Sequence, residues 1–189
     1  KKGFRAVAGL DEAGRGPLAG PVVAAAVIFT VLPDGHSIND SKKLSPKKRS
    51  SLVFEIFAAA ASVGVGICWP AEIDEINIHR ASLLAMERAA ASLSVSPDYL
   101  LIDGKFPIRS KTPQLPIISG DSLSVSIAAA SIIAKTTRDR LMVSYERLFP
   151  GYDLASNKGY PSKGHLASLA SLGPTPIHRR TFRGVLPAG

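Results

Sequence analysis

The chain has 189 residues, 46% of them hydrophobic, which suits one well-packed domain and is short for two. Lys and Arg outnumber Asp and Glu by 23 to 15, so the formal charge of +8 and the pI of about 9.8 favour a polyanionic partner. No apolar run is long enough to span a membrane, no signal-peptide pattern is present, and the single cysteine excludes an internal disulfide. We therefore expect a protein of the reducing cytoplasm.

Two apolar runs open the chain, at residues 4–10 and 22–29, and predict two strands joined by a glycine-containing connection. Ser45-Pro46 is typical of a helix N-cap followed by a first-turn proline, and the helix that it begins is expected to end in the alanines before residue 63. Residues 63–69 are the third strand candidate. The first third of the chain therefore predicts neighbouring strands followed by a helix and another strand.

Helices and strands alternate in the rest of the chain. We expect a long amphipathic helix at 76–93, short buried strands at 99–102 and 115–118, a helix from 122 to about 148, and a short helix at 166–171. The last of these lies in a loop-rich C-terminal segment that starts at about residue 150. Together these elements predict a single α/β domain over residues 1–189, with a mixed sheet covered by helices.

Four acidic residues stand where predicted strands end. Asp11 and Glu12 close the first strand, Asp103 closes the strand at 99–102, and Asp121 follows the strand at 115–118. Because strand ends in such a sheet converge on one rim, these carboxylates would repel one another unless a divalent cation neutralised them, and oxygen ligands favour Mg²⁺ or Mn²⁺. Two such ions about 4 Å apart activate a water and stabilise the leaving oxygen of a phosphodiester. The acids therefore predict a metal-dependent nuclease.

Each acid also has a purely structural interpretation. Asp121 suits the N-cap of the helix that follows, and Asp103 followed by glycine is typical of a turn. Side chains alternate along a strand, so Glu12 reaches the metal only if the chain bends after Asp11, which makes it the less secure ligand. Asp139 lies about 27 Å beyond Asp121 on a continuous helix and is expected to form surface salt bridges near Arg138 and Arg140.

The turn after the first strand contains Gly14-Arg15-Gly16. With Ala19 it superficially matches a dinucleotide-binding G-x-G-x-x-A, but a strand pattern follows where that site needs a helix. A P-loop is also excluded, because Arg15 and Gly16 stand where it needs Lys followed by Ser or Thr. What is left is a glycine-flanked arginine whose backbone can approach a sugar and a phosphate. A tight turn with an exposed arginine is the alternative.

Two groups of cations lie outside the acidic set. Five cations within residues 40–49, among them Lys42 and Lys43, surround a helix start, where they oppose the helix dipole and indicate a phosphate ligand. A solvated charged face explains them equally well. Further cations flank Tyr160 in the loop-rich C-terminal segment and recur at 178–180. Tyr160 is suited either to stack on a sugar or base or to pack as an ordinary aromatic.

Taken together, these motifs resemble the ribonuclease HII family. The matching segments run in order over nearly the whole chain, at residues 9–17, 40–45, 102–104, 120–121, 128–135, 158–160 and 176–180. The resemblance implies an RNase H-like fold, a five-stranded mixed sheet flanked by helices with a C-terminal helical segment. It also implies that two ions, Mg²⁺ or Mn²⁺, are bound by Asp11, Glu12, Asp103 and Asp121.

In that family the Gly-Arg-Gly backbone, here Gly14, Arg15 and Gly16, recognises the 2′-hydroxyl of a ribonucleotide, and a tyrosine matching Tyr160 stacks on the following sugar. The implied reaction is hydrolysis on the 5′ side of a ribonucleotide, in an RNA/DNA hybrid or within duplex DNA, leaving 3′-hydroxyl and 5′-phosphate ends. The 2′-hydroxyl is what distinguishes RNA from DNA at one site, so the chemistry needs such a reader. Asn157 departs from the family, which often has histidine before Lys-Gly-Tyr. We expect a monomer.

Other interpretations stay open at this level. Type 3 ribonuclease H, a sister enzyme, normally carries an extra N-terminal substrate-binding domain, for which the sequence before residue 4 leaves no room. Because the sequence starts at Lys1 without methionine, we expect a trimmed N-terminus that could conceal such a domain. Another nuclease or recombinase of the same fold would act on branched DNA, but it leaves Gly14, Arg15 and Gly16 unexplained. A non-catalytic basic nucleic-acid-binding module would use the acids only as caps and turns.

Overall fold

The computed structural model describes residues 3–31, 38 and 46–186. Its strands are β1 (Val7–Ala13), β2 (Val22–Ile28), β3 (Ser62–Cys68), β4 (Tyr99–Asp103) and β5 (Gln114–Ile117). Its helices are α1 (Pro46–Ala59), α2 (Pro70–Ala91), α3 (Val125–Leu148), α4 (Leu154–Asn157) and α5 (Lys163–Leu172), with a 3-10 turn, η2 (Gly120–Ser122), before α3. None of the described helices is long and apolar enough to cross a membrane.

The strands form one five-stranded sheet in the order β3-β2-β1-β4-β5. β2 pairs antiparallel with both β1 and β3, whereas β4 pairs parallel with both β1 and β5. The apolar sequence of β2 is buried at every position, as expected for an interior strand that packs on both faces. These pairings confirm the expected five-stranded mixed sheet.

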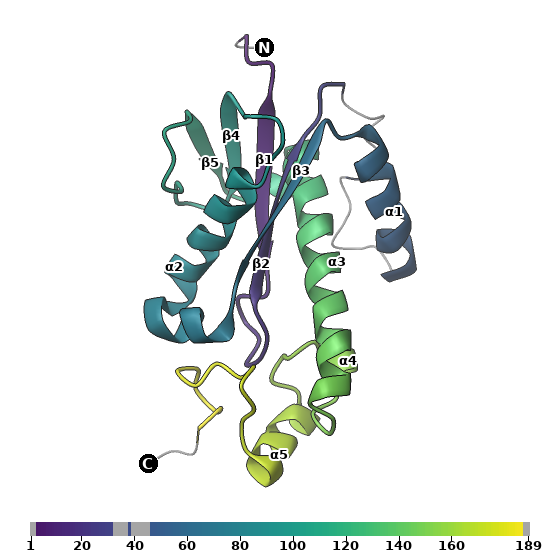
Figure 1. Ribbon diagram of the computed structural model, residues 1–189, viewed down its shortest axis with the longest axis vertical. Helices are drawn as coiled ribbons and strands as arrows, with labels where there is room; N and C mark the ends of the chain where they lie inside the picture. Colours follow the sequence, from purple (N-terminus) through teal and green to yellow (C-terminus); the bar gives the residue numbers. More distant parts are fainter. Residues whose placement is uncertain (1–2, 32–37, 39–45, 187–189) are drawn as a thin grey trace.

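Helices cover both faces of the sheet (Figure 1). One apolar cluster joins the sheet to α2, and a second joins its other face to α1 and α3. The helices approach closely where the strands carry glycine: a Cβ at Gly9 would lie 2.3 Å from the nitrogen of Ile127, and a Cβ at Gly66 would lie 2.1 Å from the carbonyl oxygen of Ala85. Glycine therefore sets the distance between strand and helix at these points.

The first strand lies later in the chain than predicted. It was expected at 4–10 but spans Val7–Ala13, because the carboxylate of Asp98 accepts the two backbone amides before the strand, at 2.7 and 3.0 Å, and so removes them from the ladder. At the other end, alanines of β2 pair with Asp11 and Glu12, so the strand continues past them. Both acids therefore lie within β1, and the expectation that they close the strand is wrong.

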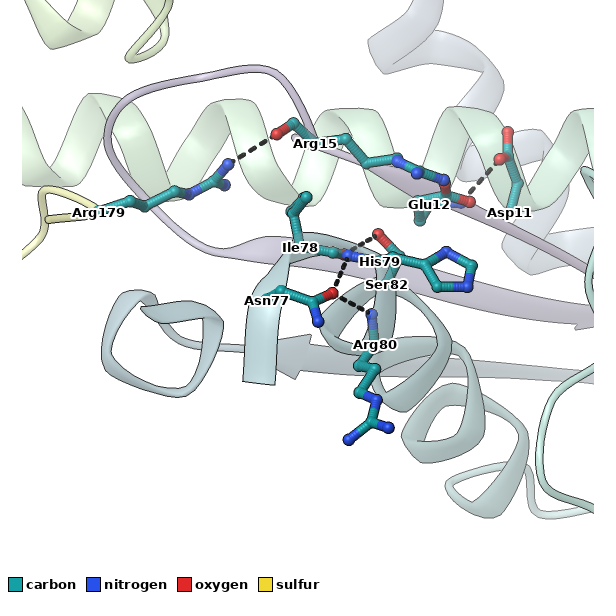
Figure 2. Close-up of polar contacts among 9 residues, drawn as sticks. All are labelled: Asp11, Glu12, Arg15, Asn77, Ile78, His79, Arg80, Ser82 and Arg179. Atoms are coloured by element: carbon teal, nitrogen blue, oxygen red, sulfur yellow. Dashed lines mark hydrogen bonds and ion pairs between the residues drawn. The ribbon is translucent and has the colours of Figure 1, made fainter. Parts of the chain in front are cut away.

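Helix α2 begins before its predicted start at residue 76, because Pro70 suits the first helical turn. The helix is interrupted at Asn77, which has φ 68° and ψ 163°. The side-chain oxygen of Asn77 accepts the backbone amides of His79 at 3.0 Å and Arg80 at 3.2 Å, and so it caps the second half of the helix (Figure 2). The periodicity seen in the sequence therefore described only the part of α2 after the kink.

Boundaries in the C-terminal half also differ. α3 was expected from residue 122 but begins after Ser124, whose hydroxyl accepts an amide of the first turn, so Asp121 is not the N-cap of this helix. α5 was expected from residue 166 but begins after Ser162, which caps it in the same way. The four-residue α4 was not predicted, because so short a helix has no readable apolar period.

The C-terminal segment folds back onto the connection between β1 and β2 (Figure 1). The backbone amide of Leu18 donates to the carbonyl of Gly159, that of Gly20 to Ile177, and that of Arg179 to Leu18, each at 2.8 Å. A third apolar cluster fills the space between the connection and this segment. The glycine-rich turn after β1 is therefore held by chain that lies far away in the sequence.

Candidate active site

Asp11 and Glu12 project from opposite faces of the sheet, as alternation along β1 requires. Asp11 is buried on the α3 side, where it accepts a hydrogen bond from Ser131 and another from the backbone amide of Glu12 at 2.7 Å. Glu12 lies on the α2 side, where it lines a pocket with Ser82. Its Oε1 accepts a hydrogen bond from Nη1 of Arg15 at 3.1 Å (Figure 2). Glu12 thus keeps the orientation that made it the less secure ligand.

Asp103 and Asp121 lie next to this part of β1. The parallel register of β1 and β4 places Asp103, the last residue of β4, beside Asp11. Oδ1 of Asp103 accepts the backbone amide of Gly120 at 2.7 Å. That hydrogen bond brings the adjoining Asp121, which is buried in η2, to the same edge of the sheet.

Burial and the repulsion of neighbouring carboxylates disfavour negative charge on Asp11 and Glu12. Loss of hydration raises the pKa of Asp11 well above its ordinary value, and the carboxylates of Glu12 and Asp103 raise it further, against the lowering effect of the hydrogen bond from Ser131. Burial also raises the pKa of Glu12, although Arg15 opposes that shift. A bound cation would relieve both the lost hydration and the repulsion.

A pocket of about 120 Å³ opens beside Glu12 and Asp103. Its walls also include the cationic or polar side chains of Arg15, His79 and Lys105, together with apolar side chains of α2 and of the loop after β4. A space of this size holds only a few water-sized groups. It is therefore suited to hydrated ions or to one phosphate group.

The donor chemistry of this edge fits a hard divalent cation. All four acids offer carboxylate oxygens, the ligands that Mg²⁺ and Mn²⁺ prefer. Within the described ranges, no three Asp, Glu, His or Cys side chains are already close enough to enclose an ion. Mg²⁺ usually keeps several waters and is bound by one or two carboxylates together with substrate phosphate.

The Gly14-Arg15-Gly16 turn follows β1 directly and lies beside Tyr160. Gly14 has a φ of +97°, and a Cβ there would lie 2.1 Å from Nε of Arg138, so the position requires glycine. A Cβ at Gly16 would lie 3.5 Å from the ring of Tyr160. Arg15 and Gly16 are exposed, and so is the tyrosine ring. The turn and the ring therefore form one accessible surface.

Arg179, which the sequence alone did not single out, holds this turn from inside. It is fully buried and donates to the carbonyl oxygens of Gly14 at 2.6 Å, Arg15 at 2.9 Å and Gly20 at 3.0 Å. The sequence showed Arg179 only as one of the cations at 178–180 in the loop-rich segment, without any sign that it is buried. The available signal was its place in a segment shared with the family, but its separation from Gly14 by 165 residues hid the contact.

Arg138 holds the other side of the same connection. It is buried and donates to the carbonyls of Ala19, Pro21 and Lys158, each at 3.0 Å. Loss of hydration lowers its pKa from the ordinary value. Arg138 thus joins the connection after β1 to the loop that precedes Tyr160.

His165 and His178 form a buried pair next to Tyr160. The Thr175 amide donates to Nδ1 of His178 at 3.0 Å, which leaves the proton of that ring on Nε2. This Nε2 donates to Nε2 of His165 at 3.0 Å, and Nδ1 of His165 donates to the Tyr160 carbonyl at 2.9 Å. Each ring is therefore neutral. In agreement, burial and the nearby His165 lower the pKa of His178 to about 4.

Asn157, where the family often has histidine, shapes the loop that carries Tyr160. Its Nδ2 donates to the carbonyl of Tyr152, and its Oδ1 accepts the amide of Gly159, both at 2.7 Å. The side chain thereby ties the two ends of α4 together. Asn157 therefore supports the loop that carries Tyr160.

Two remaining expectations concern charged residues outside this edge. Asp139 forms a salt bridge, as expected, but its partner is Lys135 at 2.7 Å, whereas Arg138 donates from each guanidinium nitrogen to a carbonyl oxygen. Lys42 and Lys43 lie outside the described residues. Their expected phosphate contacts stay a prediction.

The five-stranded mixed sheet flanked by helices, with Asp103 at the end of β4 beside Asp11 of β1, belongs to the class of nucleases with an RNase H-like fold. A family model for ribonuclease HII matches residues 8–185. Ribonuclease HII of Geotalea uraniireducens (strain Rf4) is 58% identical over 188 residues, which are 98% of this chain and 86% of that protein. The crystal structure of the ribonuclease H2 from Pyrococcus horikoshii OT3 has a TM-score of 0.79 at 25% identity and covers 95% of both chains.

The chain therefore belongs to the ribonuclease HII family, and it is a metal-dependent endonuclease that acts on nucleic acid. Of the two ribonuclease H types considered above, the family match favours type 2. Bst-RNase HIII, solved in complex with Mn²⁺, has a TM-score of 0.65 at 18% identity and covers 95% of this chain and 68% of its own. At that identity the likeness shows the shared fold alone.

Proposed function

We propose that this endonuclease hydrolyses the phosphodiester on the 5′ side of ribonucleotides, in RNA/DNA hybrids and within duplex DNA, leaving 3′-hydroxyl and 5′-phosphate ends. The observation that carries the proposal is a direct connection: the Arg15 side chain joins the Gly14-Arg15-Gly16 turn to Glu12 at the acidic edge (Figure 2). A group that reads ribose would thus lie next to the groups that support cleavage.

The metal ligands in this proposal are Asp11, Asp103 and Asp121, with Glu12 as the less secure fourth. Asp11 is held in place by Ser131 and by a backbone amide, so its carboxylate is fixed before substrate arrives. When bound, two divalent ions, Mg²⁺ or Mn²⁺, supply a Lewis acid and an activated water for the scissile phosphate. The choice of a hard divalent ion is supported by the ligand set, which consists of carboxylate oxygens.

Substrate recognition is assigned to the turn and its neighbour. The backbone of Gly14, Arg15 and Gly16 would read the 2′-hydroxyl, because glycine leaves the peptide groups uncovered. The exposed ring of Tyr160 would stack on the adjoining sugar. We assign additional phosphate contacts to Arg15 and to Lys42 and Lys43, as the charge of +8 favours. We further propose a cytoplasmic monomer.

The test compares Asp103→Asn with Asp98→Asn on an RNA/DNA hybrid and on an all-DNA duplex, with Mg²⁺, with Mn²⁺ and with a chelator. The two acids lie at opposite ends of β4, and only Asp103 belongs to the proposed site. We expect the wild type and Asp98→Asn to cleave the hybrid with either metal and Asp103→Asn to lose about a thousandfold or more in kcat, since it loses a metal ligand.

A thermal melt of each variant accompanies the assay, because Asp98 anchors the backbone before β1. Retained cleavage by Asp103→Asn would remove the acidic edge from the mechanism. A loss of cleavage by Asp103→Asn that matched a loss of folding would point instead to a structural role.

A further inference from the structure

We propose that Arg179 is a positioning residue for ribose recognition, because its guanidinium fixes two peptide planes of the Gly14-Arg15-Gly16 turn. The inference rests on the proposed function, since it assumes that this turn contacts the ribose. Arg179 lies beneath the turn and needs no contact with substrate. Its effect would pass through the backbone that it holds.

The orientation follows from peptide geometry. In a trans peptide, the carbonyl of one residue and the amide of the next point in opposite directions, and the described part of the chain has no cis peptide. Arg179 draws the carbonyls of Gly14 and Arg15 inward, so the amides of Arg15 and Gly16 point away from it. Both residues are exposed. Successive outward amides of this kind are suited to bind an oxygen-rich group.

Arginine is specifically suited to this position. Its planar fork serves three carbonyls at once, which the single ammonium of lysine cannot reproduce. The guanidinium also lies 5.0 Å from the centre of the Phe182 ring, and the Arg179 amide donates to the Leu18 carbonyl, so both backbone and side chain are fixed.

Burial of Arg179 disfavours the charged form of its guanidinium. Loss of hydration and the repulsion of Arg138 lower the pKa of Arg179 to about 9. Its guanidinium donates to three carbonyl oxygens of the connection after β1. These hydrogen bonds therefore fix the backbone conformation of the connection between β1 and β2.

The test measures binding selectivity in the Asp103→Asn background, where turnover is expected to be absent. Affinity is measured for a DNA duplex with one ribonucleotide and for the same duplex without it. We expect Arg179→Lys to lower the ratio of the two affinities by about tenfold, while affinity for the all-DNA duplex stays within about twofold, because phosphate contacts are left in place. A purely structural role would weaken both complexes equally.

Two further variants complete the design. Arg88→Lys is the matched control, since Arg88 also donates to a strand carbonyl, that of Ile67 at 2.6 Å, but lies outside the candidate site. Arg179→Gln serves if the lysine variant does not fold, because it keeps two N–H donors and carries no charge to bury. Arg88→Lys should keep the wild-type ratio, and Arg179→Gln should lower it.

The outcomes separate this inference from the proposed function. If the parent protein prefers the ribonucleotide duplex and the folded Arg179 variant keeps the full preference, the positioning role of Arg179 is overturned. If the parent protein shows no preference at all, the assignment of the turn to ribose recognition fails, and the inference fails with it.

Discussion

Asp11 carries its charge where little water reaches it and where two other carboxylates lie close by. Because its folded pKa is raised above the ordinary value of 3.8, its contribution to stability is complete below that value and is lost as the pH rises through the folded pKa. Above that folded pKa and without metal, the ionised carboxylate therefore lowers the free energy of unfolding. A buried acid that lowers stability in this way is typical of a functional site.

We predict that Asp11→Asn melts at a higher temperature than the wild type in the presence of a chelator, by about 3 °C, the shift that roughly 1 kcal/mol gives in a chain of this size. Added Mg²⁺ or Mn²⁺ should raise the melting temperature of the wild type and leave the variant almost unchanged. Calorimetry with and without metal measures both effects. A variant that is stabilised by metal as strongly as the wild type would exclude Asp11 as a ligand.

Gly14 shows how tightly the turn is packed. We predict that Gly14→Ala lowers the free energy of unfolding by about 2–4 kcal/mol, because it adds a clash with Arg138 to the strain of a positive φ. Gly104→Ala is the control, since Gly104 has a similar φ of +103° with nothing within 4 Å of the added Cβ. Urea denaturation measures the free energy of unfolding of both variants. Equal losses would contradict the prediction that an added Cβ at Gly14 clashes with Arg138.

At the scale of elements, the kink in α2 depends on Asn77, which combines a strained backbone with a helix cap. We predict that Asn77→Ala lowers the free energy of unfolding by about 2 kcal/mol, because it loses the two capping hydrogen bonds and keeps the strain. Asn77→Gly should lose less, since glycine relieves the positive φ. Thermal melts rank the variants, and an alanine variant as stable as glycine would show that the kink carries no strain.

The docking of the C-terminal segment depends on a neutral His178. Because its folded pKa of about 4 lies below the ordinary 6.5, the stability that this group contributes is complete above pH 6.5 and is lost as the pH falls toward 4. We predict that the free energy of unfolding falls over this window and that His178→Gln flattens the fall. Urea titrations at several pH values measure it, and an identical slope in both proteins would exclude His178 as the titrating group.

At the scale of the whole molecule, the charge of +8 predicts binding to nucleic acid that depends on salt. We expect affinity for an all-DNA duplex to fall by about 10- to 100-fold between about 50 and 200 mM salt, as two to four phosphate contacts would give. The double variant Lys42→Gln, Lys43→Gln should make the slope of log affinity against log salt shallower by about two. An unchanged slope would remove these lysines from the phosphate contacts.

Local signals in the sequence were enough to predict the sheet and to propose the four acids as one set of metal ligands, which stays a prediction. Strand-forming runs ending in Asp103 and Gly120-Asp121 are visible without any long-range information. The hidden features depend on partners that are distant in sequence. Asp98 shifts the start of β1 from 93 residues away, and Arg179 reaches Gly14 across 165. No local pattern distinguishes such a buried arginine from one in a solvated basic tail.

The central claim is that one site reads a ribose and cleaves next to it. The most direct measurement is the mapping of product ends after the wild type is incubated with Mg²⁺ and a DNA duplex that contains a single ribonucleotide, beside the same duplex without it. We predict one cut, on the 5′ side of the ribonucleotide, with a 3′-hydroxyl and a 5′-phosphate, and no cut in the all-DNA duplex. Cleavage at other positions, or equal cleavage of both duplexes, would contradict the assignment of the turn to ribose and of the acids to the adjoining phosphate.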